Sequence, residues 1–313
     1  MAHFVQIMHP GPEPVVNGNR KPWNQGLHRR CFLQSTGTAL TATEETVQAN
    51  LVFWGEWESP ASVRPLKGTK VGLPTQLFVP TSEPCPEQGT PQNTDPFVFG
   101  DEFLYCCCYQ VKKDGTPTYL SKLERGDVIL FGSNLEHLFV LDTVFVVNSC
   151  TDYDPRNWTA SLGKNLPDAF VQATLKPLEL AFRGKGVASD NKSLCTEKSW
   201  SKEDQTCTEG CVPCDVSPRQ YRLYRGATIN NRVGDMFSFV PAMILSDPPG
   251  GFARPSLNSL EFVINDLPFW GGCRVNVQDY IGPWNKVKEA VLAQGLLLGV
   301  QFELPKPKKT TQI

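Results

Sequence analysis

The residues best suited to chemistry are four cysteines in one polar stretch, at Cys195, Cys207, Cys211 and Cys214. Thiolates separated by two to four residues can occupy two corners of a tetrahedral zinc site. The surrounding segment, 184–217, is rich in Ser, Lys, Glu, Asp and Thr, so it cannot fold by burying apolar surface alone. Metal binding would supply the missing folding energy. A structural zinc ion is therefore the first expectation for this segment.

Two other interpretations of these cysteines stay open. Their Cys-x3-Cys-x2-Cys spacing is also that of the iron–sulfur cluster in radical S-adenosylmethionine enzymes. The motif lies late in the chain, however, and does not follow the first strand of an α/β barrel, as that family would require. The remaining interpretation is a surface loop with incidental thiols, or with a disulfide formed in vitro.

A second group of reactive residues lies near residue 100. Cys106 to Cys108 fall in a predicted strand over 97–110, where alternate side chains face opposite sides. Free cysteine packs as a small apolar residue, so we interpret this run as packing rather than as a catalytic thiol. Asp101 and Glu102 precede it and, with His28, form the candidate catalytic set. Turn chemistry also accounts for the two carboxylates.

Basic residues mark two candidate phosphate sites. Arg29 and Arg30 follow His28, and the planar arginine fork pairs bidentately with phosphate. Arg222 and Arg225 lie farther along the chain, on a predicted strand. Solvated turns and an edge strand with one polar face are the competing explanations.

Aromatic residues accompany these basic positions. Tyr224 alternates with the arginines of its strand, an arrangement that can stack bases while holding the nucleic-acid backbone. Trp54 and Trp57 flank Gly55, which marks a bulge that would bring them closer together. This pair could form a slot for a flat ligand, with core packing as the alternative.

The pattern of elements predicts a β-rich α+β protein with a mixed or antiparallel sheet, or a partly closed barrel, and few helices. We expect one compact domain over 1–183 and 218–304, interrupted by the insertion 184–217 and followed by a disordered basic tail over 305–313. Strand-like segments are 51–57, 97–110, 128–132, 138–147 and 296–304. Helical segments are 167–175, 177–182 and 284–293.

Composition limits the partners. The 313 residues carry 30 Lys and Arg against 32 Asp and Glu, so any nucleic-acid surface must be local. No apolar run approaches the roughly 18 residues that span a bilayer, and the first residues do not resemble a signal peptide. Eleven cysteines without an export signal indicate reduced thiols or metal ligands rather than a disulfide framework. We expect a cytoplasmic protein without a membrane partner.

The segment 123–132, with the strand that follows over 139–147, resembles PUA-like domains, the group that includes ASCH and EVE modules. In that group a Gly-Asp turn leads into an apolar strand of a small β-barrel. The resemblance implies a pocket that receives a nucleotide base, often a modified one, and supplies no catalytic residues. Residues 9–11, 23–24, 28–30, 93–96 and 236–241 also resemble bacterial proteins of unassigned function.

These features favour a nucleic-acid or modified-nucleotide recognition protein, within a bacterial defence or base-modification system. Trp54 and Trp57 would line its pocket, while Arg29, Arg30 and Arg225 would bind phosphate. The first rival is an enzyme acting on a nucleotide or small molecule, so the sequence leaves catalysis open. The second rival is a subunit of a protein complex whose zinc-bearing insertion docks a partner.

The cysteine spacing generates a prediction about metal content. Purified protein should carry about one equivalent of zinc in this segment, lost when Cys211 and Cys214 are changed to serine. Elemental analysis by mass spectrometry measures the zinc. A metal-free protein with freely titratable thiols would contradict the zinc interpretation, and visible absorbance from bound iron would favour the cluster.

Overall fold

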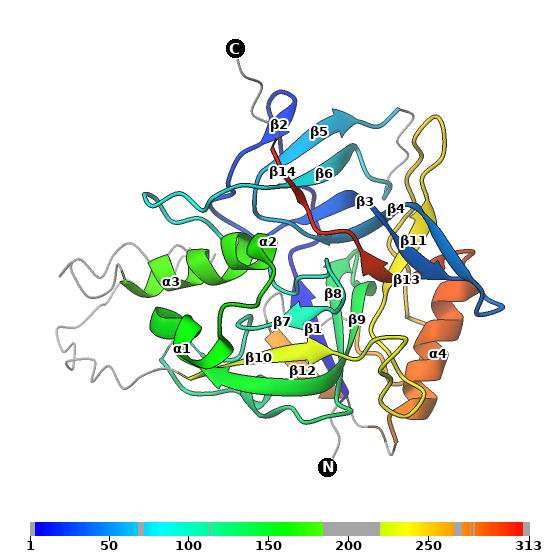
Figure 1. The fold of residues 1–313 in the computed structure, drawn as a ribbon. Coiled ribbons are helices and arrows are strands. Elements are labelled where there is room, and N and C mark those ends of the chain that lie inside the picture. The colour runs from blue at the N-terminus through cyan, green and yellow to red at the C-terminus, as the bar shows by residue number, and fades with distance from the viewer. Residues whose placement is uncertain are drawn as a thin grey trace, which may run out of the picture.

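The computed structural model describes residues 4–67, 72–112, 114–183, 220–265, 271–275, 277 and 279–308. The insertion 184–217 lies outside this part of the chain, as do its four cysteines. Within the described residues the protein is β-rich with two mixed sheets and short helices, which confirms the predicted α+β class. Figure 1 shows one sheet above the other, with α1 to α3 at one side and α4 at the opposite side.

The first sheet has the strand order β12-β1-β8-β9-β10-β7. Only the β1–β8 pair is parallel; the other neighbours are antiparallel. Its strands are β1 (Phe4–His9), β7 (Leu104–Tyr105), β8 (Val128–Leu135), β9 (Leu138–Tyr153), β10 (Tyr221–Gly226) and β12 (Gly271–Val275).

The second sheet has the order β13-β11-β4-β3-β6-β5-β2, and β13 also pairs with β3. Strands β3, β4, β11 and β13 therefore close into a ring. Its strands are β2 (Arg20–Lys21), β3 (Arg30–Leu40), β4 (Thr46–Glu56), β5 (Ala61–Pro65), β6 (Gln76–Ser82), β11 (Val240–Ile244) and β13 (Leu297–Phe302). A two-residue strand, β14 (Lys306–Pro307), pairs with β6, so the predicted disordered tail is ordered at its start.

The helices agree well with expectation. The segment predicted over 167–182 forms α2 (Asp168–Phe170), a π-helical turn η3 (Val171–Leu175) and α3 (Lys176–Arg183). The segment predicted over 284–293 forms most of α4 (Ile281–Leu292), with Pro283 in its first turn, where a missing N–H costs nothing. The remaining helical turns are η1 (Tyr119–Lys122), η2 (Pro155–Asn157) and α1 (Trp158–Leu162).

Buried apolar side chains join the two sheets. The largest cluster includes Val5 and Ile7 of β1, Leu33 of β3, Phe53 of β4 and Phe145 of β9. Such a core holds β1, β3, β4 and β9 in fixed relation. No helix in the described part of the chain is long and apolar enough to cross a bilayer.

Candidate active site between the two sheets

A network of buried charges crosses the junction of the sheets. Arg30 on β3 donates from Nη1 to Glu56 Oε2 on β4 at 2.8 Å, and its Nε lies 3.0 Å from Asp142 Oδ2 on β9. Arg254 Nη1 lies 3.9 Å from the other oxygen of Asp142. All four side chains are buried. Because an unpaired buried charge is strongly unfavourable, each of these groups requires its partners.

The network continues toward solvent through a second carboxylate. Glu58 Oε2 lies 3.8 Å from Lys21 Nζ, and Lys21 also donates to the carbonyl of Trp57. His28 Nδ1 lies 3.4 Å from Glu56 Oε1 and 3.5 Å from Glu58 Oε1. Burial lowers the pKa of His28, but the two carboxylates outweigh burial and raise it to about 10. The His28 side chain is 29% exposed, so it lies where the network meets solvent.

The three consecutive cysteines do not form the predicted strand. Only Leu104 and Tyr105 pair as β7, and the chain then turns around the carboxylate of Asp95. Asp95 accepts the backbone N–H groups of Cys106 at 2.9 Å, Cys107 at 2.8 Å and Cys108 at 2.7 Å. The strand prediction was wrong here because one buried carboxylate satisfies three donors that a sheet would otherwise pair.

This turn fixes the backbone on both sides of Cys108. Tyr109 follows with φ +58°, a left-handed conformation that is uncommon for a residue with a large side chain. Burial raises the pKa of Asp95 while the three amides lower it, and the balance is a pKa of about 6. The carboxyl group is therefore mostly ionised at neutral pH. A strained residue beside a cradled carboxylate is typical of a functional turn.

The turn places Cys108 beside a histidine from the first sheet. Cys108 Sγ lies 3.0 Å from His9 Nε2, and His9 Nδ1 lies 3.3 Å from Glu56 Oε2. The Tyr109 ring stacks on the His9 ring with centroids 6.0 Å apart. Cys108 is half-buried, whereas His9 and Glu56 are buried. A thiol, a base within hydrogen-bond reach and a carboxylate that orients the base are the parts of a nucleophilic triad.

Glu56 is itself held in place. Arg30 donates to its Oε2 at 2.8 Å, and the backbone N–H of Asp95 donates to its Oε1 at 3.1 Å. Burial, together with the carboxylates of Glu56 and Asp95, raises the pKa of Cys108 well above its ordinary value. The resting sulfur is therefore a thiol, and His9 Nε2 lies within hydrogen-bond distance of it.

Two groups among the described residues could hold a metal ion, each with its ligand atoms within 4.8 Å of one another. One is Asp95 with Cys106 and Cys107; the other is His28 with Glu56 and Glu58. In the first group the carboxylate oxygens already accept three amides, and the pKa values of both thiols are raised, which disfavours thiolate ligands. In the second group the pKa values of Glu56 and Glu58 are lowered, which favours carboxylate ligands, whereas the raised pKa of His28 means that a metal ion would have to displace the imidazolium proton.

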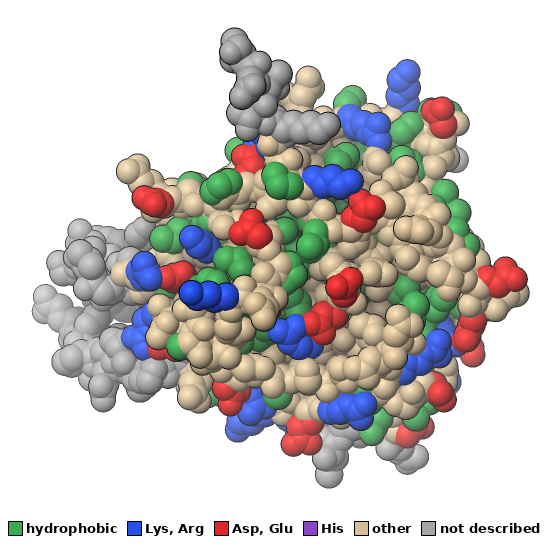
Figure 2. Space-filling view, viewed as in Figure 1, with side chains coloured by type: hydrophobic (Ala, Val, Ile, Leu, Met, Phe, Trp, Pro, Cys, Tyr) green, Lys and Arg blue, Asp and Glu red, His purple; other side chains and the backbone are tan. Residues whose placement is uncertain are grey.

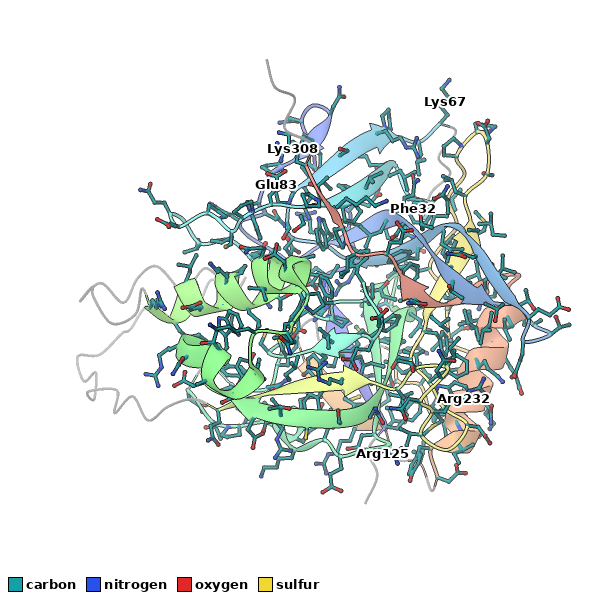
Figure 3. The ribbon with its side chains drawn as sticks, in the orientation of Figure 1. Phe32, Lys67, Glu83, Arg125, Arg232 and Lys308 are labelled. Atoms are coloured by element: carbon teal, nitrogen blue, oxygen red, sulfur yellow. The ribbon has the colours of Figure 1, made fainter. Side chains whose placement is uncertain are left out.

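The aromatic residues predicted to stack bases lie in the core instead. Trp57 and Tyr224 are fully buried, the first against Phe97 and Phe99 and the second against Tyr105. Trp54 packs on Phe32, which is labelled on β3 in Figure 3. The stacking prediction is wrong for these three residues because none of them presents a ring face to solvent.

The predicted phosphate-binding arginines are already engaged. Arg30 is buried between Glu56 and Asp142 and cannot reach an external phosphate, so that prediction is wrong. Arg29 donates to the Glu13 carbonyl at 3.2 Å. Arg222 Nε lies 2.7 Å from Asp152 Oδ1, and Arg225 pairs with Glu102.

The predicted catalytic set of Asp101, Glu102 and His28 is not brought together. Asp101 is exposed and accepts from Gln301 Nε2 at 3.1 Å, and Glu102 pairs with Arg225. Only His28 belongs to the buried network. The predicted zinc ligands Cys195, Cys207, Cys211 and Cys214 lie outside the described residues.

Sequence reasoning missed His9, Glu56, Asp95 and the role of Cys108. One signal was available, because charged residues stand inside otherwise apolar strands. Glu56 lies between two tryptophans, and Asp142 interrupts the long apolar segment 138–147. A carboxylate at such a position is buried, and a buried carboxylate requires partners.

The Asp95 cradle generates a prediction about stability and site geometry. Changing Asp95 to asparagine would direct an NH2 group at backbone N–H donors, so we expect unfolding in urea to be easier by about 2–4 kcal/mol. The exposed Asp101→Asn variant is the control and should stay within about 0.5 kcal/mol of the wild type. Equal stability of both variants would show that the three amide hydrogen bonds to the Asp95 carboxylate do not stabilise the fold.

Comparison of the chain with protein-family models, with curated proteins and with solved structures finds no match. The resemblance to PUA-like domains accordingly stays a prediction. Function must be argued from the side chains that the fold brings together.

Proposed function

We propose that the protein is a thiol-dependent enzyme in which Cys108 is the nucleophile and His9 the general base. Glu56 orients the His9 ring and stabilises the imidazolium that forms. One observation carries this proposal: the His9 ring lies between the other two groups, with Nε2 3.0 Å from Cys108 Sγ and Nδ1 3.3 Å from Glu56 Oε2. Among the three functional classes that the sequence left open, this arrangement supports an enzyme.

The proposed reaction is acyl transfer. His9 Nε2 takes the Cys108 proton as the sulfur attacks the carbonyl carbon of an ester or amide. The leaving alcohol or amine accepts that proton as the carbon–heteroatom bond breaks, which leaves a thioester on Cys108. Water then attacks the thioester, giving its proton to His9, and the acid departs as the thiol is restored from His9. Atoms and charges balance over the two half-reactions.

The surroundings of the triad support this order of events. Since the pKa of Cys108 is raised, the thiol must lose its proton during attack rather than before it. Arg30 and the Asp95 N–H hold both oxygens of Glu56, so the His9 ring has one fixed orienting partner. Fixed positions for the base and the nucleophile are worth several orders of magnitude in rate.

The triad generates a prediction about acyl chemistry. With p-nitrophenyl acetate the wild-type protein should acetylate Cys108, and Cys108→Ala and His9→Gln should each slow nitrophenol release by roughly 100-fold or more. Nitrophenol absorbance gives the rate, and peptide mass spectrometry locates the acetyl group.

Two matched variants serve as controls. Cys150→Ser removes an exposed thiol and His137→Gln changes an exposed histidine in the turn between β8 and β9, so both should hydrolyse the ester at the wild-type rate. Wild-type hydrolysis by Cys108→Ala, or acetylation of Cys150 alone, would overturn the proposal.

Nucleic-acid or nucleotide recognition is a second proposal, and its remaining candidate contacts are two arginines of β10. Arg222 and Arg225 keep 31% and 35% of their side chains exposed, although each has an acidic partner. On the face shown in Figure 2, acidic and basic side chains are interspersed rather than gathered into one basic patch. Any nucleic-acid contact would therefore involve few phosphates. A partner-docking role of the insertion, with structural zinc, is the third proposal.

This second proposal predicts salt-dependent binding. Binding of single- or double-stranded DNA or RNA should weaken in both Arg222→Ala and Arg225→Ala, each flattening the plot of log affinity against log salt by about one unit of slope. Fluorescence anisotropy across salt concentrations measures this. Arg183→Ala, which changes an exposed arginine on α3, is the control. No binding at low salt would remove nucleic acid as a ligand.

A further inference from the structure

We propose that His28, Glu56 and Glu58 form a zinc-binding site beside the triad, separate from any zinc held by the insertion. His28 precedes β3, Glu56 ends β4 and Glu58 follows two residues later. The pairing of Arg30 with Glu56 in the β3–β4 register brings these three side chains to one point. The site does not require the thiol chemistry, although it shares Glu56 with it.

Two of the three separations between the donor atoms fit a tetrahedral ion, and the third is within 4.8 Å. Zinc bonds of about 2.0–2.2 Å place neighbouring tetrahedral ligands roughly 3.3–3.6 Å apart. His28 Nδ1 lies 3.4 Å from Glu56 Oε1 and 3.5 Å from Glu58 Oε1. Octahedral Mg²⁺ would require about 2.8–3.0 Å, and Ca²⁺ takes oxygen ligands rather than an imidazole nitrogen.

Each carboxylate turns its Oε1 to this point. Arg30 and Lys21 lie on the opposite oxygens, Arg30 on Glu56 Oε2 and Lys21 on Glu58 Oε2. Besides facing His28, each Oε1 accepts a backbone N–H, from Asp95 at 3.1 Å and from Arg29 at 3.4 Å. Such outer contacts orient ligating carboxylates without occupying the lone pairs that face the metal.

The imidazole nitrogen faces both carboxylates. His28 Nδ1 is enclosed and lies opposite Glu56 Oε1 and Glu58 Oε1, so a zinc ion at this point would replace the proton that these three atoms now share. The His28 side chain is 29% exposed, so an ion could reach this point from solvent. Three protein ligands with one open position form the arrangement of zinc sites that also hold a water molecule.

The shared carboxylate links this site to the triad. Glu56 Oε1 would bind zinc while Glu56 Oε2 stays with His9, so the two functions use different atoms of one side chain. A bound cation would withdraw charge from Glu56 and weaken its support of His9 as a base. Zinc at this position would therefore tune the rate of the proposed acyl transfer.

The test uses the full chain with Cys195, Cys207, Cys211 and Cys214 each changed to serine, which removes the insertion as a zinc ligand. We expect one equivalent of zinc by elemental mass spectrometry. X-ray absorption at the zinc edge should show only nitrogen and oxygen neighbours at about 2.0–2.1 Å. Adding His28→Asn should weaken zinc binding by roughly 100-fold or more, whereas adding His137→Asn should leave it unchanged.

Three results would overturn the site: a four-serine chain that binds no zinc, a sulfur neighbour in its zinc spectrum, or zinc binding unaffected by His28→Asn. Circular dichroism checks that each variant folds. If the four-serine chain does not fold, the zinc-edge spectrum is measured on the wild type. It must then show one zinc ion that has only nitrogen and oxygen neighbours, besides any zinc ion bound to sulfur. Cys108→Ala should keep this zinc, so failure of the thiol proposal is distinguishable from failure of the metal site.

Discussion

The ion pair between Arg30 and Glu56 is the interaction on which the rest of the site depends. Arg30 reaches from β3 to Glu56 on β4 and to Asp142 on β9, so it links the two sheets through charge as well as through their apolar core. Removing one partner of such a buried pair costs about 3–5 kcal/mol because the other charge is left unpaired. His9, His28 and the Asp95 backbone all contact Glu56, so a substitution of Glu56 would remove one contact from each of them.

Asp95 plays the matching role on the other side of the site. Its carboxylate organises three consecutive amides, and this is the reason why Cys108 leaves the sheet and reaches His9. Two buried carboxylates thus position the two sides of the site: Glu56 contacts His9, and Asp95 holds the turn that carries Cys108. The Asp95 N–H bond to Glu56 fixes the two halves relative to each other.

The sequence predicted the fold class and the main helices because those depend on local periodicity and on end signals such as Pro283 in α4. It placed the long apolar strand at 138–147 for the same reason. The turn at Cys106–Cys108 was not predictable, because its cause is a side chain eleven or more residues earlier. The site was not predicted because it joins segments that lie far apart in the sequence, and buried charges rather than local patterns bring them together. Trp54 and Trp57 were misassigned because aromatic residues suit a core and a ligand slot equally well.

The closed ring of β3, β4, β11 and β13 has a consequence for motion. β3 has partners on both sides, and β4 lies between β3 and β11, so Arg30 and Glu56 sit on strands that cannot open without breaking several ladders at once. The turn after β7 has no such ladder. Amide hydrogens around Glu56 should therefore exchange with solvent far more slowly than those beyond Tyr109. The strands that carry Arg30 and Glu56 are the rigid side of the site, whereas the chain beyond Tyr109 is held by isolated bridges, such as that of Val111 with Pro117, which can open one at a time.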